Sequence, residues 1–170
     1  SIPLAPGGQL GLSGRPHATA LDAAQEFRDH LSALLRVSEP FGIAWLALGL
    51  QPLFGTDAAP RIPKERYRIM RDYLPSHGAM ALDMMHVTAS VQVSFDFGDE
   101  ADMVSKLRTA LGCSPIADAI YANSSLAAGR PTGNVSQRMM IWRATDPARC
   151  GGLAFAFEPD MGYARYAEWA

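Results

Sequence analysis

Residues 88–97 alternate strictly between polar and apolar side chains. The polar residues of this segment are Thr88, Ser90, Gln92, Ser94 and Asp96. The residues between and after them are Ala89, Val91, Val93, Phe95 and Phe97. A period of two places successive side chains on opposite faces of a strand, so the pattern predicts a strand with one core face and one polar face. The polar face either meets solvent or lines a site, and the pattern alone leaves both interpretations open.

Other segments have the spacing of amphipathic helices. Thr19 and Asp22 resemble a capping box ahead of a helix over about residues 20–37. Pro63 opens a second helix that ends before Pro75. A third begins after Asp99 and runs to about residue 111, and Pro115 then begins a separate helix over residues 116–122. Residues 163–169 predict a final helix with three aromatic side chains.

The remaining segments predict short strands and loops. A Pro-Gly-Gly turn at residues 6–8 is followed by an alternating strand, and residues 153–157 read as another strand. Residues 43–49 are uniformly apolar, which fits a strand covered on both faces or a buried helix. Residues 51–63 form a loop, and residues 123–136 form a long loop that is a candidate lid. The mixture predicts an α+β fold with a largely antiparallel sheet and flanking helices.

Composition excludes several classes of protein. The chain has 170 residues, 48% of them hydrophobic, and a net charge of -2, which suits one globular unit and gives no basic surface for nucleic acid. Its longest apolar run, residues 41–50, is too short to cross a bilayer. These features predict a soluble, cytoplasmic protein without a nucleic-acid or membrane partner. Both ends fall beside predicted elements, so we expect a fragment of a longer chain.

Common catalytic and metal motifs do not occur. Cys113 and Cys150 lie outside any CxxC or Cys/His pattern, which predicts free thiols. Phosphate-loop, dinucleotide, zincin and nucleophile-elbow motifs are lacking, and the histidines show no ligand spacing. Residues 64–71 carry four basic side chains. They form either a solvated helix face or an anion site.

Several short motifs follow one another in collinear order. They read PGGQ at residues 6–9, LSG at 12–14, LDMM at 82–85, VQV at 91–93, EADM at 100–103, ANS at 122–124 and TDP at 145–147. Residues 63–73 add PKERYRIMRDY, and residues 138–142 add RMMIW. Together these motifs resemble those of the plant-type glutamate-cysteine ligases of plants and proteobacteria over nearly the whole chain.

The resemblance implies a ligase that uses ATP and magnesium in glutathione biosynthesis. Such an enzyme phosphorylates the γ-carboxylate of glutamate, and the amine of cysteine then displaces phosphate to give γ-glutamylcysteine. It also implies a fold similar to that of glutamine synthetase, in which the concave face of an antiparallel sheet holds the site. Residues 1–170 would be a central part of that catalytic domain.

The resemblance also suggests roles for individual residues. The residues that it suggests for substrate binding are Arg138, Trp142, Gln92, Thr88 and Ser90. A planar guanidinium suits a carboxylate, and Trp142 would wall the same pocket if its segment is helical. The residues that it suggests for binding the phosphates of ATP are Lys64, Arg66, Arg71 and Arg149. We expect Gln92 and Arg138 to open onto one cleft, and at least one head group among Lys64, Arg66 and Arg71 to face it.

Two departures from the family pattern affect metal binding. Ala5 and Gly11 stand where the family has glutamates, whose oxygens would suit magnesium. Other departures are Val87 for arginine, Ser94 for asparagine, Ser125 for proline and Ala144 for aspartate. The metal ligands then lie outside this chain or are lost, and no residue of the chain is assigned to metal. Two hypotheses follow, an active glutamate-cysteine ligase or an impaired homologue that binds a ligand or partner without turnover.

Overall fold

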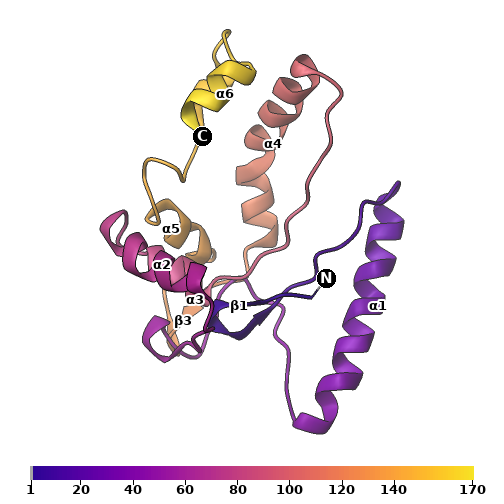
Figure 1. Ribbon diagram of the computed structural model, residues 1–170, viewed down its shortest axis with the longest axis vertical. Coiled ribbons are helices and arrows are strands. Elements are labelled where there is room, and N and C mark those ends of the chain that lie inside the picture. Colours follow the sequence, from indigo (N-terminus) through magenta and orange to yellow (C-terminus); the bar gives the residue numbers. More distant parts are fainter. Residues whose placement is uncertain (1) are drawn as a thin grey trace.

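The chain folds into helices joined by long irregular segments and two short hairpins (Figure 1). The computed structural model describes residues 2–170. Its α-helices are α1 (Ala20–Ser38), α2 (Glu65–Tyr73), α3 (Ala81–Val87), α4 (Glu100–Tyr121), α5 (Gln137–Arg143) and α6 (Tyr163–Trp169). Strand β1 (Leu4–Ala5) pairs antiparallel with β2 (Gln9–Leu10), and β3 (Leu126–Ala127) with β4 (Arg130–Pro131). This mixture is consistent with the α+β class, although the described residues form only two-stranded sheets.

Helix starts follow the local sequence signals. The Thr19 hydroxyl accepts the Asp22 N–H at 3.2 Å and caps α1. In the same way the Asp99 carboxylate accepts the Asp102 N–H at 2.9 Å and caps α4. Helix α2 begins at Glu65, two residues after Pro63. These three predicted starts and the predicted final helix α6 are confirmed.

Pro115 does not separate two helices, contrary to our prediction. Helix α4 continues through it to Tyr121. Proline has no N–H and would leave the carbonyl of residue 111 without its helical donor. The Ser114 hydroxyl donates to the Leu111 carbonyl oxygen at 2.8 Å and replaces that donor. A side-chain hydrogen bond thus lowers the cost of proline inside this helix.

The core forms around the short helix α3, which the sequence analysis did not predict. Its central cluster contains Leu50, Ala59, Val87 and Ile141. Helix α3 contacts α5 on one side and the Pro6–Gly8 turn of the first hairpin on another. The core therefore joins the N-terminal hairpin to the helix that carries Arg138.

Residues 43–49 and 88–97 touch at one point and do not form a sheet together. Leu50 and Thr88 form an isolated antiparallel bridge, with Gln51 N–H donating to the Val87 carbonyl at 2.8 Å. Beyond this bridge, residues 43–48 and 89–97 are irregular, and Val91 is 84% exposed. Neither the covered strand nor the buried helix expected over residues 43–49 forms, and the prediction of a strand with a core face over residues 88–97 is wrong for the described chain. Alternating sequence predicts a strand, but a strand also needs a partner along its edge.

Two further segments differ from the predictions in detail. Residues Ala154–Phe157 form a 3-10 helix instead of a strand, because their carbonyl groups accept local hydrogen bonds such as Glu158 N–H to Phe155 at 3.1 Å. The loop over residues 123–136 contains the β3–β4 hairpin. The loop over residues 51–63 is confirmed apart from a short 3-10 turn, Thr56–Ala58.

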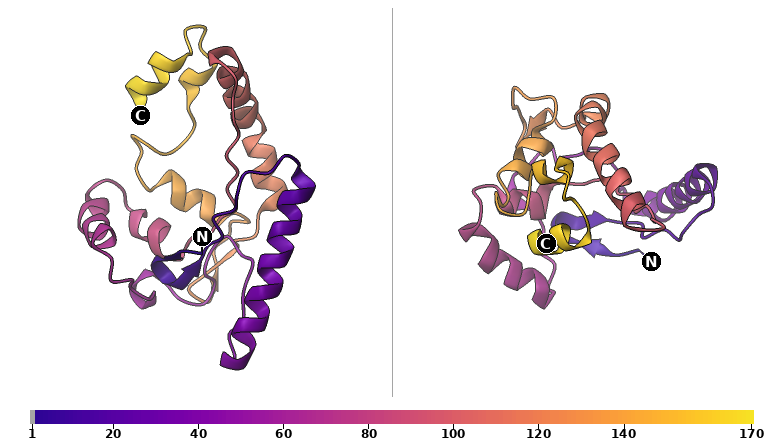
Figure 2. Two further views of the ribbon diagram at one scale, coloured as in Figure 1. Left: turned by 45° about the vertical axis from the view of Figure 1, so that its right-hand side comes forward. Right: turned by 90° about the horizontal axis from the view of Figure 1, so that it is seen from above.

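The molecule exposes more surface than a compact protein of its mass. Its accessible surface is 11872 Å², whereas a folded monomer of 18.3 kDa exposes about 8,100 Å². Figures 1 and 2 show α1 at the edge of the molecule. Its side chains Phe27, Leu31 and Leu35 are exposed. Apolar surface of this extent is typical of surfaces that pack against further protein. None of the described helices is both long and apolar enough to cross a membrane.

Candidate functional site

Arg138 lies at the second position of α5, where its backbone is fixed by Ser124. The Arg138 N–H donates to Ser124 Oγ at 3.1 Å, and the Gln137 N–H donates to the Ser124 carbonyl oxygen at 3.1 Å. Ser124 is itself buried. One serine thus accepts two of the N–H groups that the first turn of a helix leaves free. This anchor sets the direction in which the Arg138 side chain leaves the helix.

The Arg138 guanidinium lies beside Trp142, one helical turn further along α5. Its Cζ atom is 5.6 Å from the centroid of the Trp142 ring. Burial lowers the pKa of Arg138, and the negative charge of Asp118 opposes that shift. The residue stays charged, because arginine is not deprotonated in proteins. The segment is helical, as the predicted position of Trp142 required.

Both side chains carry a buried donor that is not used. Arg138 Nε and Trp142 Nε1 are buried and have no hydrogen-bond partner among the described residues. Leaving such a donor unsatisfied costs about 1–3 kcal/mol. A ligand that brings two oxygen atoms would remove this cost. The two unused donors therefore make Arg138 and Trp142 candidates for binding a ligand carboxylate.

The polar residues predicted on the central strand lie in different environments. Thr88 is buried, and its hydroxyl donates to the Met84 carbonyl oxygen at 2.7 Å. Ser90 and Gln92 are exposed, and Gln92 Nε2 contacts Ser90 Oγ at 3.2 Å. Among the described residues no hydrogen bond joins Gln92 to Arg138. A shared cleft for these two residues stays a prediction.

The basic residues Lys64, which precedes α2, and Arg66 and Arg71, which lie in α2, also differ from one another. Lys64 is exposed, and its Nζ donates to the Leu4 carbonyl oxygen at 3.5 Å. Arg66 is exposed, with its Cζ 5.2 Å from the centroid of the Tyr67 ring. Arg71 is half-buried, and its Nη1 has no hydrogen-bond partner within the described chain. Of the three, Arg71 keeps a desolvated donor for an anion.

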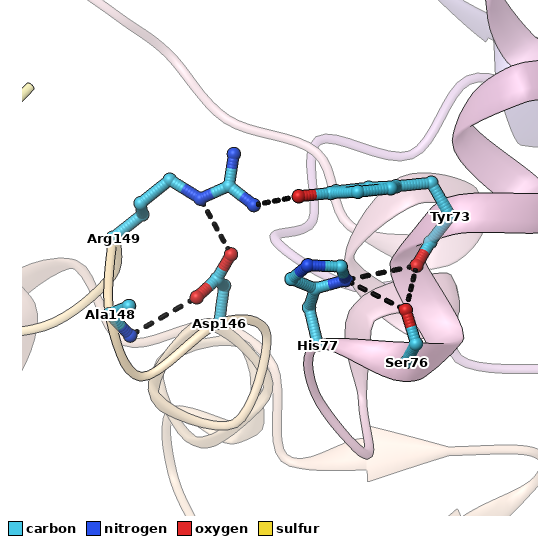
Figure 3. A network of polar contacts seen from close by, with 6 residues as sticks. All are labelled: Tyr73, Ser76, His77, Asp146, Ala148 and Arg149. Carbon is cyan, nitrogen blue, oxygen red and sulfur yellow. Dashed lines mark hydrogen bonds and ion pairs between the residues drawn. The ribbon is translucent and has the colours of Figure 1, made fainter.

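Arg149 belongs to a polar network that joins α2 to the turn after α5 (Figure 3). Its Nε donates to Asp146 Oδ2 at 2.7 Å, and its Nη2 donates to the Tyr73 hydroxyl at 3.0 Å. The Tyr73 ring stacks on His77 with 3.9 Å between centroids. The other Asp146 oxygen accepts the Ala148 N–H at 3.1 Å. Two of the three Arg149 nitrogens are therefore engaged within the protein.

Asp146 is held ionised in this network. Burial acts to raise the pKa of Asp146, but hydrogen bonds from Arg149 and the Ala148 N–H outweigh it and leave the pKa below its ordinary value of 3.8. Hydrogen bonds with the Tyr73 hydroxyl and with Asp146 raise the pKa of Arg149. The charged pair thus connects the two segments throughout the neutral range.

Ala5 and Gly11 lie on one face of the first hairpin. Ala5 pairs with Gln9, and the Gly11 N–H donates to the Pro3 carbonyl oxygen at 3.0 Å, which continues the register. Gly11 is then opposite Pro3 and diagonal to Ala5. Within the described part of the chain, no group of three His, Cys, Asp or Glu side chains is arranged to hold a metal ion. The residues present therefore do not fit the implied magnesium ion by themselves.

Three residues near Arg138 received no role from the sequence: Gly49, which lies beside its side chain, Asn123, which contacts Gly49, and Asp118, whose charge acts on it. Asn123 Oδ1 accepts the Gly49 N–H at 3.0 Å. A Cβ atom on Gly49 would lie 3.2 Å from Arg138 Cδ. Asp118 lies near enough to affect the pKa of Arg138, and it accepts the Ser136 hydroxyl at 2.8 Å. Asn123 had a sequence signal in the ANS motif, which carried a resemblance without a role.

Known proteins resemble this chain over its whole length. Residues 2–170 match Glutamate-cysteine ligase family 2 (GCS2). The chloroplastic glutamate-cysteine ligase of Nicotiana tabacum is 45% identical over 170 residues, which cover 100% of this chain and 33% of that protein. Chloroplastic glutamate-cysteine ligase A of Oryza sativa subsp. japonica is 45% identical, with 35% of that protein covered. The chloroplastic enzyme of Arabidopsis thaliana is 44% identical, with 33% covered.

The names of these relatives contradict the predicted cytoplasmic location, since all three are chloroplastic proteins. Composition and net charge gave no means of distinguishing two aqueous compartments. Receptors recognise a targeting signal as a short segment separate from the fold, so the composition of a globular segment does not indicate the compartment.

The comparisons agree with the motifs in their collinear order. The chain spans about a third of the length of the curated relatives it matches. Across that third, the match to the family includes every described residue. The chain belongs to Glutamate-cysteine ligase family 2.

Proposed function

We propose that the protein containing this chain is an ATP-dependent glutamate-cysteine ligase of glutathione biosynthesis. Residues 1–170 are then a central part of its catalytic domain, built on an antiparallel sheet similar to that of glutamine synthetase. Family membership and the motif order support this proposal. The antiparallel bridge between Leu50 and Thr88 is consistent with such a sheet.

The proposed reaction proceeds in two steps. An oxygen of the glutamate γ-carboxylate attacks the terminal phosphorus of ATP, and ADP leaves. The amine nitrogen of cysteine then attacks the γ-glutamyl carbon, inorganic phosphate leaves, and the amine proton passes to solvent. The site must stabilise phosphoryl charge and exclude water that would hydrolyse the intermediate.

The observation that carries the proposal is the unused pair of donors on α5. Arg138 Nε and Trp142 Nε1 are buried and without hydrogen-bond partners among the described residues, and Arg138 Cζ lies 5.6 Å from the centroid of the Trp142 ring. We assign Arg138 to a carboxylate of glutamate, with Trp142 as the wall of that pocket. Thr88, Ser90 and Gln92 complete the substrate side in this proposal.

The phosphates of ATP are assigned to the basic residues Lys64, Arg66, Arg71 and Arg149. Arg71 has the strongest support, because its Nη1 is buried and unused within the described chain. The family implies magnesium as well. No described acidic cluster fits the ion, so its ligands would lie outside residues 2–170.

The test uses the full-length protein with glutamate, cysteine, ATP and magnesium, and measures γ-glutamylcysteine and phosphate. Arg138→Ala should raise KM for glutamate about 10- to 150-fold, since a hydrogen bond to a charged group contributes about 1.5–3 kcal/mol. Arg143→Ala is the matched control, because Arg143 is the exposed arginine at the other end of α5. Equal KM values for the two variants would contradict the assignment of Arg138.

The second candidate function is an impaired homologue that binds a ligand or partner without turnover. The specific observation in its favour is that Ala5 and Gly11 put no oxygen ligand on their shared hairpin face. Glutamate binding in calorimetry of the full-length protein, together with no γ-glutamylcysteine in the activity assay, would favour this candidate. Product formation would exclude it.

A further inference from the structure

We propose that Asn123 is a positioning residue that holds Gly49 against the stem of Arg138 and so fixes the guanidinium for a substrate carboxylate. The inference rests on the proposed function of Arg138. It assigns a role to a residue that does not itself contact the carboxylate.

The Asn123 side chain makes two hydrogen bonds to one edge of residues 47–49. Its Oδ1 accepts the Gly49 N–H at 3.0 Å, and its Nδ2 donates to the Ala47 carbonyl oxygen at 3.4 Å. On the same edge, the Gly49 carbonyl oxygen accepts the Ala89 N–H at 3.1 Å. An antiparallel ladder would need the Gly49 N–H for its next bond. Asn123 therefore takes the place of a strand residue and ends the pairing one residue beyond Leu50.

Gly49 has no room for a side chain. A Cβ atom at this position would lie 2.7 Å from Asn123 Oδ1, 3.2 Å from Arg138 Cδ and 3.7 Å from Ser124 Cβ. The bare backbone of Gly49 thus forms a wall against the aliphatic part of Arg138. Moving Gly49 would change the space available to that side chain.

Arg138 is consequently fixed at two points by neighbouring residues of one loop. Ser124 holds its backbone N–H, and Asn123 holds the glycine that limits its stem. Without Asn123 the stem gains freedom, and binding must then order a long side chain, which costs about 0.5–1.5 kcal/mol. This corresponds to a roughly 2- to 12-fold loss of affinity. The loss should appear in KM for glutamate with kcat unchanged, as expected for binding energy shared by the ground state and the transition state.

The experiment compares Asn123→Ala with Asn134→Ala in the full-length protein. Asn134 is an exposed asparagine of the same loop whose amide donates to Gln137 Oε1 at 2.8 Å. Asn123→Ala should raise KM for glutamate about fivefold, with kcat and the KM values for ATP and cysteine within twofold. Asn134→Ala should leave all four constants within twofold. A purely structural role would instead lower kcat or affect the three substrates together.

A double-mutant cycle tests the contact itself. Gly49→Ala should raise KM for glutamate on its own, because its Cβ meets Asn123 and Arg138. The same substitution should have a smaller effect in the Asn123→Ala background, where one of those contacts is absent. Additive effects would overturn the inference. If Asn123→Ala does not fold, an unchanged KM in Gly49→Ala alone would overturn it.

Failure of the inference and failure of the proposed function give different results. An active wild type with an unchanged KM in Asn123→Ala overturns only the positioning role. A wild type that neither forms γ-glutamylcysteine nor binds glutamate in calorimetry overturns the proposed function, and the positioning role with it.

Discussion

Replacing Gly7 by alanine should destabilise the protein more than the same change at its neighbour Gly8. Both glycines have left-handed backbones, with φ of 77° at Gly7 and 75° at Gly8. The two sites differ in their surroundings. A Cβ atom on Gly7 would overlap the backbone carbonyl oxygen of His86, whereas one on Gly8 would meet only Pro60 Cγ at 3.8 Å. Gly8→Ala is therefore a matched control that carries the backbone strain without the overlap.

The two contributions can be estimated separately. Left-handed backbone at an alanine costs about 1–2 kcal/mol, so Gly8→Ala should lower the free energy of unfolding by about that amount. Gly7→Ala adds the displacement of α3, because His86 belongs to that helix and its carbonyl cannot rotate away independently. Overpacking of this kind costs about 1–3 kcal/mol more. The expected total for Gly7→Ala is about 2–5 kcal/mol.

Urea unfolding of the full-length protein, followed by tryptophan fluorescence, measures both variants. The difference in the free energy of unfolding is calculated from the difference in urea midpoint, with one denaturant slope (m value) for both variants. If Gly7→Ala and Gly8→Ala differ by less than about 0.5 kcal/mol, the first hairpin does not contact α3 as described, since surface substitutions alone remain within that range.

Two further predictions concern charge. The folded pKa of Asp146 lies below its ordinary value of 3.8, so its contribution to stability is complete above that value and is lost as pH falls through the folded pKa. Urea midpoints of Asp146→Asn and wild type should therefore differ more at pH 7 than at about pH 2, and a difference that does not change with pH would refute this role. The double substitution Ala5→Glu and Gly11→Glu should tighten the binding of magnesium–ATP to the full-length protein in calorimetry, because the two positions share one hairpin face. Equal binding in wild type and double variant would show that these positions do not carry the metal.

Local signals in the sequence determined the elements whose hydrogen bonds close within a few residues. The Thr19 hydroxyl caps α1 from its own N-terminus, and Pro63 precedes α2 as predicted. The family resemblance, which also depends on the order of residues alone, is confirmed over residues 2–170. Arg138 was selected from its residue type and motif, and the helical spacing to Trp142 followed from the sequence.

Tertiary contacts decided what happens between segments far apart in the chain. The alternating pattern of residues 88–97 predicts a strand, but pairing ends next to Leu50, where the Asn123 amide oxygen, 74 residues beyond Gly49 in the chain, accepts the Gly49 N–H. The unused donors of Arg138 and Trp142 could not be predicted, because burial without an acceptor depends on every neighbouring segment. The sequence motifs selected Arg138, whereas only the folded chain shows that Ser124 accepts its backbone N–H and that Gly49 lies beside its aliphatic part.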